Sequence, residues 1–408
     1  MERHIYLDYN ATTPLRDEVR EVMADALFVY GNASSMHRSG REARAQVEEA
    51  RRAVAALIGA RRAEEVIFTS GGSESNNTVF ETMRDIVTRK CNGGGKDDNR
   101  TEIITTVVEH PCVLNSAKYL KERGYKVTFL PVDEAGKVKM NEYRAALNDR
   151  TLLVSVMMAN NEIGTIEDIA EIVRLAKSVG ALTHTDATQA VGKIPVDVEA
   201  LGVDYLTMSC HKIYGPKGIG ALYKREGAPL SPLIHGGHQE DGFRAGTYNN
   251  LGIIGFGEAA RLAKRDLAEY GRTMRELRDR LRDGLLATIP NIKVNGHPTD
   301  VLPNTLNVSF PGAEGEAILL SLDLEGIEAS TGSACASGSL DPSHVLMAIG
   351  VWPELAHGSI RFSLGQGVTQ EDIGYVLEKT PPIIARLRAM STVRAPLCRD
   401  ATCTICKE

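Results

Sequence analysis

Short apolar segments alternate with amphipathic ones between residues 66 and 224, and this alternation predicts the fold of the region. Most of the apolar segments show no alternation of apolar and polar positions, which indicates strands that are buried on both faces. The region therefore predicts an α/β fold in which a mainly parallel seven-stranded sheet carries helices on both faces. The predicted strands are 66–69, 102–107, 127–132, 152–158, 181–185, 205–209 and 220–224, and the predicted helices between them are 75–89, 111–123, 140–147 and 166–178.

The pattern changes after Gly252. Two helices are expected to end the ordered chain, one on each side of Pro381 and Pro382, because proline interrupts helical hydrogen bonding. We expect a large domain over 15–255, a smaller α+β domain built from 1–14 and 256–390, and a flexible tail at 391–408. The other expected elements are helices at 41–58, 253–287, 315–322, 369–379 and 383–390, strands at 292–294, 305–309 and 360–364, and a surface insertion at 91–100.

Composition and charge narrow the class of protein. The chain has 408 residues, of which 43% are hydrophobic and 25% charged, values typical of globular proteins. Its net charge of −6 shows no excess of basic residues of the kind that binds nucleic acid or a membrane surface. The longest apolar run, 152–159, is too short to span a bilayer, and the first residues do not form a signal peptide pattern. Seven cysteines without a disulfide-like spacing favour a reducing compartment, most simply the cytoplasm.

Lys212 and Asp186 indicate a candidate chemistry. Lys212 follows the apolar run 205–208 and precedes a Gly/Pro turn, so a strand delivers its amine into a tight loop. Asp186 ends another predicted strand. Pyridoxal phosphate (PLP) needs an amine for its aldehyde and a carboxylate for its pyridinium nitrogen, and this pair supplies both. Taken alone, a lysine in such a loop is more often a solvated turn residue.

Polar residues also follow three other predicted strands. Gly72 and Ser73 lie between a strand and a helix start, where backbone N–H groups bind anions, although Ser73 could simply cap the helix. His110 could stack on a cofactor ring, move protons or be structural, and Asn161 could donate through its amide. With Asp186, four strand ends carry polar groups, which favours one shared site over four separate structural roles.

Two residues of the smaller predicted domain complete the candidate set. Arg361 lies in an otherwise apolar strand and needs an anionic partner, either a substrate carboxylate or an internal salt bridge. Cys335 lies among small residues without large apolar neighbours, which favours a reactive thiol on an exposed loop over a packed structural one. No metal ligand is assigned among these residues.

With these residues in place, the chain resembles the cysteine desulfurases, a branch of the class V aminotransferases among the fold-type I PLP enzymes. The resemblance runs from Tyr6 to about Met390, and the cysteine-bearing segment and TTVVEHP are most similar to the NifS/IscS group. It rests on YLDYNATTP (6–14), GNASS (31–35), FTSGGSESNN (68–77), TTVVEHPCVL (105–114), ANNEIGT (159–165), HTDATQAVGK (184–193), HKIYGPKGIG (211–220), HGGHQEDGFRAGT (235–247), STGSACASGSLDPSHVL (330–346) and IRFSLG (360–365).

The resemblance implies a role for each matching residue. Lys212 would hold PLP covalently and move the Cα proton of the substrate, and His110 would stack on the ring as a further catalytic residue. Asn161 and Arg361 would hold the substrate carboxylate, with Asn161 also touching the cofactor. The other implied contacts are Asp186 at the pyridinium nitrogen, Gln189 at the phenolic oxygen, Gly72, Ser73, Ser209 and His211 at the phosphate, and Thr247 at the phosphate of the neighbouring subunit of a homodimer.

Four positions depart from the usual pattern of this family. Serine replaces threonine at Ser73 and keeps the hydroxyl, and alanine replaces proline at Ala33. Tyr248 stands in place of glutamate and Gln366 in place of arginine. None of the four changes the expected chemistry.

The implied activity converts L-cysteine to L-alanine, with the sulfur held as a persulfide on Cys335 and passed to an acceptor protein, expected to be an iron–sulfur scaffold. A true aminotransferase would use the same PLP site but would not need the segment that carries Cys335, and release of alanine without a keto-acid acceptor separates the two. A selenocysteine lyase is an alternative at the level of the substrate. An alternative of another class is a metal- or redox-binding partner protein that acts through Cys398, Cys403 and Cys406.

Overall fold

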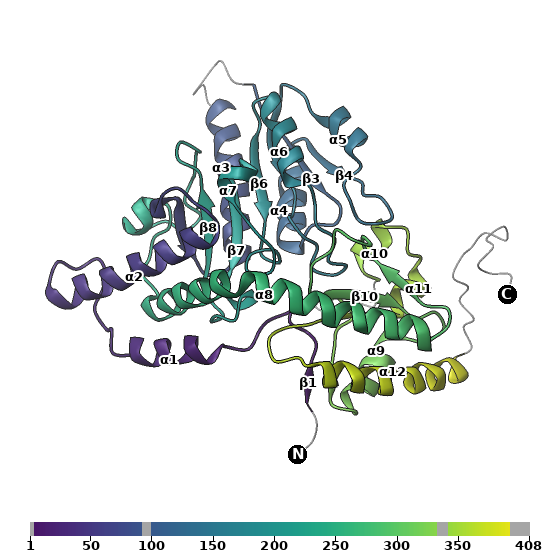
Figure 1. Ribbon diagram of the computed structural model, residues 1–408. Helices are drawn as coiled ribbons and strands as arrows, with labels where there is room; N and C mark the ends of the chain where they lie inside the picture. Colours follow the sequence, from purple (N-terminus) through teal and green to yellow (C-terminus); the bar gives the residue numbers. More distant parts are fainter. Residues whose placement is uncertain (1–3, 92–98, 333–341, 392–408) are drawn as a thin grey trace.

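The computed structural model describes residues 4–91, 99–332 and 342–391, and its main element is a seven-stranded sheet (Figure 1). The strand order is β2-β8-β7-β6-β5-β3-β4. Only β8 (Gly220–Lys224) runs antiparallel to its neighbours within this sheet, so the predicted mainly parallel seven-stranded sheet is confirmed. The other six strands are β2 (Val66–Thr69), β3 (Glu102–Thr106), β4 (Val127–Leu130), β5 (Thr151–Ser155), β6 (Leu182–Asp186) and β7 (Tyr205–Ser209).

Both faces of this sheet are covered, which explains why its strands lack a polar face. On one face, Ile103 and Leu153 pack against α3 (Gly72–Cys91) and α4 (Pro111–Glu122). The next residues along the same strands, Ile104 and Val154, point to the other face. There they join a core with α2 (Arg38–Leu57), α5 (Met140–Ala146), α6 (Ile169–Ser178) and the start of α8 (Asn250–Thr288). Adjacent residues on opposite buried faces require continuous apolar runs.

The 39-residue helix α8 connects two hydrophobic cores (Figure 1). Its first turns place Ile253 and Phe256 in the core beneath the large sheet. Its later turns place Met274 and Leu281 in a second core, which also contains β10 (Thr305–Ser309), β12 (Ser359–Ser363), α9 (Gly315–Asp323) and α12 (Gln370–Met390). The predicted domain boundary between residues 255 and 256 falls inside α8, and the domain ranges stay a prediction.

The second core is closed by two small sheets. β10 pairs in antiparallel fashion with β12 and with β9 (Lys293–Asn295), and β1 (Ile5–Tyr6) pairs in parallel with β11 (Ile327–Glu328). Ile5 and Leu7 are buried in the same core. The chain therefore begins in the smaller unit and crosses to the large sheet through residues 8–13, which become one wall of the candidate site.

Several helix boundaries differ from the predictions by up to three residues, and two of the differences have a clear physical cause. α12 runs without a break through Pro381 and Pro382, whereas the sequence predicts two helices. Its proline rings remove two hydrogen-bond donors, but Ile373, Val376 and Ile384 on both sides of them are buried in the second core, and this packing keeps the halves in line. Helix α6 begins at Ile169 and not at 166, because the Asp168 carboxylate caps it by accepting from the Glu171 N–H at 3.1 Å.

Several short elements have too little periodicity to be predicted. They are α1 (Asp17–Ala26), α7 (Val198–Leu201), α10 (His344–Ala348), α11 (Pro353–His357) and the 3₁₀ helices η1 (Ala63–Glu65), η2 (Cys210–Lys212) and η3 (Gln239–Gly242). Within the three described ranges, no helix is long and apolar enough to cross a membrane. Most of the predicted insertion at 91–100, the segment that carries Cys335 and nearly all of the predicted tail lie outside the described residues.

Candidate active site

The candidate site lies at one edge of the large sheet, where five strands end. β2, β3, β5, β6 and β7 run in the same direction, so their carboxyl ends meet at this edge. The segments that follow them enclose a cavity of about 410 Å³. Ten of the residues named from the sequence line it: Gly72, Ser73, His110, Asn161, Asp186, Gln189, Ser209, His211, Lys212 and Arg361.

Lys212 lies in η2, directly after β7. Its Nζ atom donates to the backbone carbonyl of Asn10 at 2.5 Å and to that of Ala11 at 2.7 Å. The turn that follows is held in place because Thr13 Oγ1 accepts from the Tyr214 N–H and donates to the His211 carbonyl. The amine is therefore directed across the cavity toward the N-terminal segment.

Asp186 is the last residue of β6 and is only 6% exposed. One carboxylate oxygen accepts from Asn76 Nδ2 at 2.7 Å, and the other accepts from the backbone N–H of Thr188 at 2.9 Å. Two fixed donors thus orient a buried carboxylate at the cavity wall. A buried carboxylate of this kind can pair with a protonated ring nitrogen.

His110 caps the first turn of α4. Its Nδ1 atom accepts from the backbone N–H of Cys112 at 3.3 Å, so the neutral ring carries its proton on Nε2. Burial lowers the pKa of His110, and the nearby Lys212 and His344 add to this effect while Asp186 opposes it. A neutral imidazole at neutral pH suits stacking against a flat cofactor ring.

The start of α3 forms the anion-binding end of the site. Gly72 and Ser73 begin the helix, where free backbone N–H groups and the helix dipole favour an anion. A Cβ atom on Gly72 would lie 3.1 Å from Thr188 Oγ1, so glycine leaves room here. A second cavity of about 400 Å³ adjoins this point and is lined by Ser73, Ser209, His211 and Lys217 among others. Burial and three neighbouring lysines lower the pKa of His211 to about 4, so it is neutral at neutral pH.

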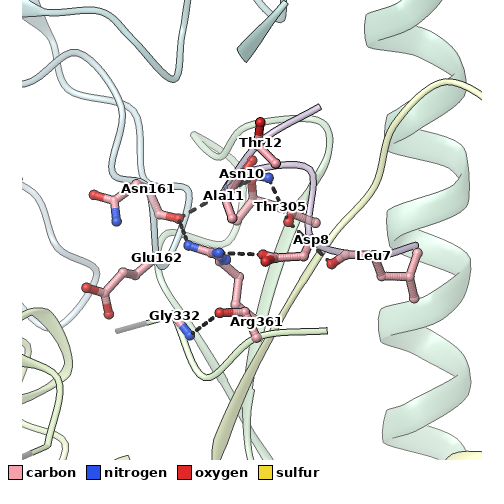
Figure 2. Close-up of polar contacts among 12 residues, drawn as sticks. Leu7, Asp8, Asn10, Ala11, Thr12, Asn161, Glu162, Thr305, Gly332 and Arg361 are labelled. Atoms are coloured by element: carbon pink, nitrogen blue, oxygen red, sulfur yellow. Dashed lines mark hydrogen bonds and ion pairs between the residues drawn. The ribbon is translucent and has the colours of Figure 1, made fainter. Parts of the chain in front are cut away.

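Arg361 forms the internal salt bridge that is one of the two alternatives left open by the sequence, and its contact with a substrate carboxylate stays a prediction. It is 3% exposed, and its Nη2 atom pairs with the Asp8 carboxylate at 2.6 Å, which is an internal salt bridge. Its Nη1 atom donates to the Asn161 backbone carbonyl at 2.9 Å, while the Asn161 side chain points away from the guanidinium (Figure 2). Arg361 Nε is buried and has no hydrogen-bond acceptor among the described residues. That remaining donor suits a substrate carboxylate.

Two named residues are not brought into the cavity. Thr247 lines a separate cavity of about 270 Å³ together with Glu240, Arg244 and Tyr248. The predicted contact of Thr247 is with the phosphate bound by the neighbouring subunit. The structure of a single chain does not test this contact, which stays a prediction. Cys335 lies outside the described residues, but Gly332, three positions before it, lines the 410 Å³ cavity.

The sequence reasoning also missed residues of the site. Asn76 and Thr188 hold Asp186, and Asn10 accepts hydrogen bonds from Lys212 and Gln189 through its backbone carbonyl. Asn76 could have been found, because it lies three positions after Ser73 and shares its helix face. Asn10 could not, since its partners are about 180 to 200 positions away.

Two other cysteines near the site are poor nucleophiles. Cys112 lines the cavity, but burial raises the pKa of its thiol to about 12, and Asp186 contributes. Cys210 is fully buried, and burial raises the pKa of its thiol well above its usual range. Both thiols are therefore protonated at neutral pH. Among the described residues, no group of three or more His, Cys, Asp or Glu side chains is arranged to hold a metal ion.

The residues present fit PLP. The cavity combines a lysine amine, a buried carboxylate, a neutral imidazole and a helix N-terminus, which are the groups that its aldehyde, ring nitrogen, ring face and phosphate require. Thr188 Oγ1, which has no hydrogen-bond partner in the described part of the chain, adds a hydroxyl beside Gly72. The sequence profile of aminotransferase class-V proteins matches residues 5–376.

The chain belongs to the aminotransferase class-V family. Among curated class-V relatives, "Cysteine desulfurase IscS" of Dictyoglomus turgidum is 50% identical over 392 residues, which are 96% of this chain and 97% of that protein. "Cysteine desulfurase NifS" of Azotobacter vinelandii is 44% identical over 95% of this chain and 94% of its own. A solved structure titled "NIFS-LIKE PROTEIN" is similar with a TM-score of 0.86 at 39% identity, covering 94% of this chain and all of that one. The resemblance to the NifS/IscS group is thereby confirmed.

Proposed function

We propose that this protein is a PLP-dependent cysteine desulfurase that converts L-cysteine to L-alanine and holds the sulfur as a persulfide on Cys335. The observation that carries the proposal is that Lys212, Asp186 and Arg361 line one cavity, with the start of α3 at its anion-binding end. Nearly full-length relatives named cysteine desulfurase support the choice of reaction within the family.

When bound, PLP would withdraw electron density from the Cα atom of an amino acid substrate. Arg361 would hold the substrate carboxylate through Nε, which has no other acceptor among the described residues. The Lys212 amine would hold the cofactor and move the Cα proton, and its hydrogen bonds to two backbone carbonyls keep it at the cavity wall. Asp186, which is oriented by Asn76 and Thr188, would pair with the ring nitrogen. His110 would cover the ring face.

Cys335 is the sulfur acceptor in this proposal. Its thiolate attacks the substrate sulfur, so a sulfur–sulfur bond forms as the bond between Cβ and sulfur breaks. The electron pair of the broken bond stays with the carbon skeleton, which takes up protons and leaves as L-alanine. The protonated Cys112 and Cys210 thiols cannot substitute for it. Gly332 at the cavity wall supports access from the segment that carries Cys335.

We infer a homodimer in which Thr247 contacts the phosphate bound by the neighbouring subunit. The support is that Thr247 lies apart from the cavity of its own chain, on a segment fixed by the ion pair of Arg244 with Glu74 at 2.9 Å. The acceptor of the persulfide sulfur is proposed to be an iron–sulfur scaffold protein, and the location the cytoplasm.

The test incubates the purified protein with PLP and L-cysteine in the presence of a thiol reductant and without any keto acid. A desulfurase produces equal amounts of alanine and sulfide under these conditions, whereas an aminotransferase needs the keto acid. Lys212→Ala should lose the visible absorption band of the bound cofactor and all alanine formation. Lys264→Ala, which changes an exposed lysine of α8, is the matched control and should keep both. Alanine formation that depends on an added keto acid would overturn the proposal in favour of aminotransferase activity.

A further inference from the structure

Lys193 is a buried lysine behind the candidate site. It is 3% exposed, and no carboxylate in the described part of the chain forms an ion pair with it. Its Nζ atom donates to two side-chain amide oxygens instead, Gln189 Oε1 at 2.7 Å and Asn10 Oδ1 at 3.0 Å. A buried amine costs free energy unless its hydrogen bonds are satisfied, so this arrangement requires an explanation.

The charges around Lys193 favour the neutral amine. Burial lowers the pKa of Lys193 well below its usual range, and Lys212 and Arg361 lower it further. His211 also lies within reach of its charge. A neutral amine has two N–H groups, and these match the two amide oxygens that accept from Lys193.

Lys193 and the backbone carbonyl of Asn10 together fix the orientation of the Gln189 amide. Gln189 Oε1 accepts from Lys193, and Gln189 Nε2 donates to the Asn10 backbone carbonyl at 2.9 Å. Turning the amide over would place Oε1 against that carbonyl oxygen, so two acceptors would face each other without a proton between them, and Oε1 would no longer accept from Lys193. The amide therefore has one favoured orientation.

Asn10 is held by the same lysine. Its Oδ1 atom also accepts from Asn304 Nδ2 at 3.1 Å, and its backbone carbonyl accepts from both Gln189 and Lys212. Lys193 therefore fixes two residues that contact the cavity, although Lys193 does not line the cavity itself.

We propose that Lys193 is a positioning residue that fixes the Gln189 amide so that its second N–H group is presented to the phenolic oxygen of PLP. The inference rests on the proposed function, in which Gln189 contacts that oxygen. Among the described residues, this second N–H has no hydrogen-bond partner, and Gln189 lines the cavity. Lys193 acts through Gln189 and does not touch the cofactor.

The experiment measures a spectroscopic property of the bound cofactor. The pH midpoint of its visible absorption change depends on how well the ionised phenolic oxygen is stabilised. Lys193→Met keeps the length of the side chain and removes both donors, and it should raise this midpoint by about one pH unit, the size expected from the loss of one hydrogen bond. Gln189→Leu should raise the midpoint in the same direction. The double variant should show no more than the Gln189→Leu shift, because in this proposal Lys193 acts on the oxygen through Gln189.

Matched variants keep the proposal falsifiable. Lys264→Met should leave the midpoint unchanged, and Lys193→Gln, which retains two N–H donors, should shift it less than Lys193→Met. An unchanged midpoint in Lys193→Met, additive shifts in the double variant, or equal shifts in Lys193→Gln and Lys193→Met would each overturn the role of Lys193. If the unaltered protein has no visible cofactor band, the proposed function fails with it, whereas a band with an unshifted midpoint contradicts only the positioning role.

Discussion

Arg361 serves the fold and the substrate site with one side chain. Its pairing with Asp8 joins β12 to the N-terminal segment, and its contact with Asn161 joins β12 to the segment after β5. Only Nε is left without a partner in the described structure. A planar guanidinium is needed here, because the ammonium group of a lysine cannot reach Asp8, the Asn161 carbonyl and a substrate carboxylate at the same time.

Arg361→Lys should raise the KM for L-cysteine by about 10- to 100-fold, the effect of losing one charge-assisted hydrogen bond to the carboxylate. Lysine can keep the ion pair with Asp8, so the fold and the cofactor band should be retained. Steady-state kinetics with L-cysteine is the measurement. Arg278→Lys is the control, since Arg278 is equally buried but donates to the Leu302 carbonyl at 2.8 Å and does not line the cavity. An unchanged KM in Arg361→Lys would show that the substrate carboxylate binds elsewhere.

Lys212, Asp186 and His110 could be predicted from the sequence because each closely follows or ends a strand of a parallel sheet, and the ends of such strands share one edge. Arg361 was open between two roles, and the structure gives it an internal partner while its Nε atom has no acceptor among the described residues. Asn10 and Lys193 could not be predicted as a pair, since 183 positions separate them and neither has a local signal. The motifs contain both residues, but only the packing of the N-terminal segment against the loop after β6 shows what they do.

Besides positioning site residues, the strands contain polar side chains that are buried inside the sheet. His184 of β6 is 3% exposed and bridges its two neighbours, with Nδ1 at 2.8 Å from Ser155 Oγ of β5 and Nε2 at 3.2 Å from Thr207 Oγ1 of β7. Burial lowers the pKa of His184 to about 4. The folded protein therefore keeps this histidine neutral over a range in which the unfolded chain takes up a proton.

This element predicts a loss of stability in mild acid. Because the folded pKa lies below the unfolded value, the contribution is present above about pH 6.5 and is lost as the pH falls toward 4. At pH 5 the loss in the free energy of unfolding amounts to roughly 2 kcal/mol. Urea unfolding at pH 7.5 and pH 5, at one protein concentration, measures the free energy of unfolding at each pH. His184→Gln should lose less of this free energy between the two pH values than the unaltered protein does. The control His4→Gln, at an exposed histidine, should lose as much as the unaltered protein. Equal pH dependence in His184→Gln and the unaltered protein would contradict the neutral buried histidine.

At the scale of the whole molecule, the site depends on two units that α8 holds together. The large sheet supplies the lysine, the carboxylate and the anion-binding helix, while the second unit supplies Arg361 and the segment before Cys335. Residues 8–13 cross between the units and form the shared wall. The described residues that line the cavity lie between Asn10 and Arg361.

The most direct test of the account is the fate of sulfur on Cys335. The holoenzyme is treated with L-cysteine without reductant and then digested. The masses of its cysteine-containing peptides are measured by mass spectrometry, and free alanine is measured in parallel. We predict one additional sulfur atom on the Cys335 peptide and a matching amount of alanine. Cys335→Ser should keep the cofactor band but release no alanine, and Cys112→Ser, at the cysteine that lines the cavity, should behave as the unaltered protein. Alanine release by Cys335→Ser at the normal rate, or the added sulfur on another cysteine, would contradict the account.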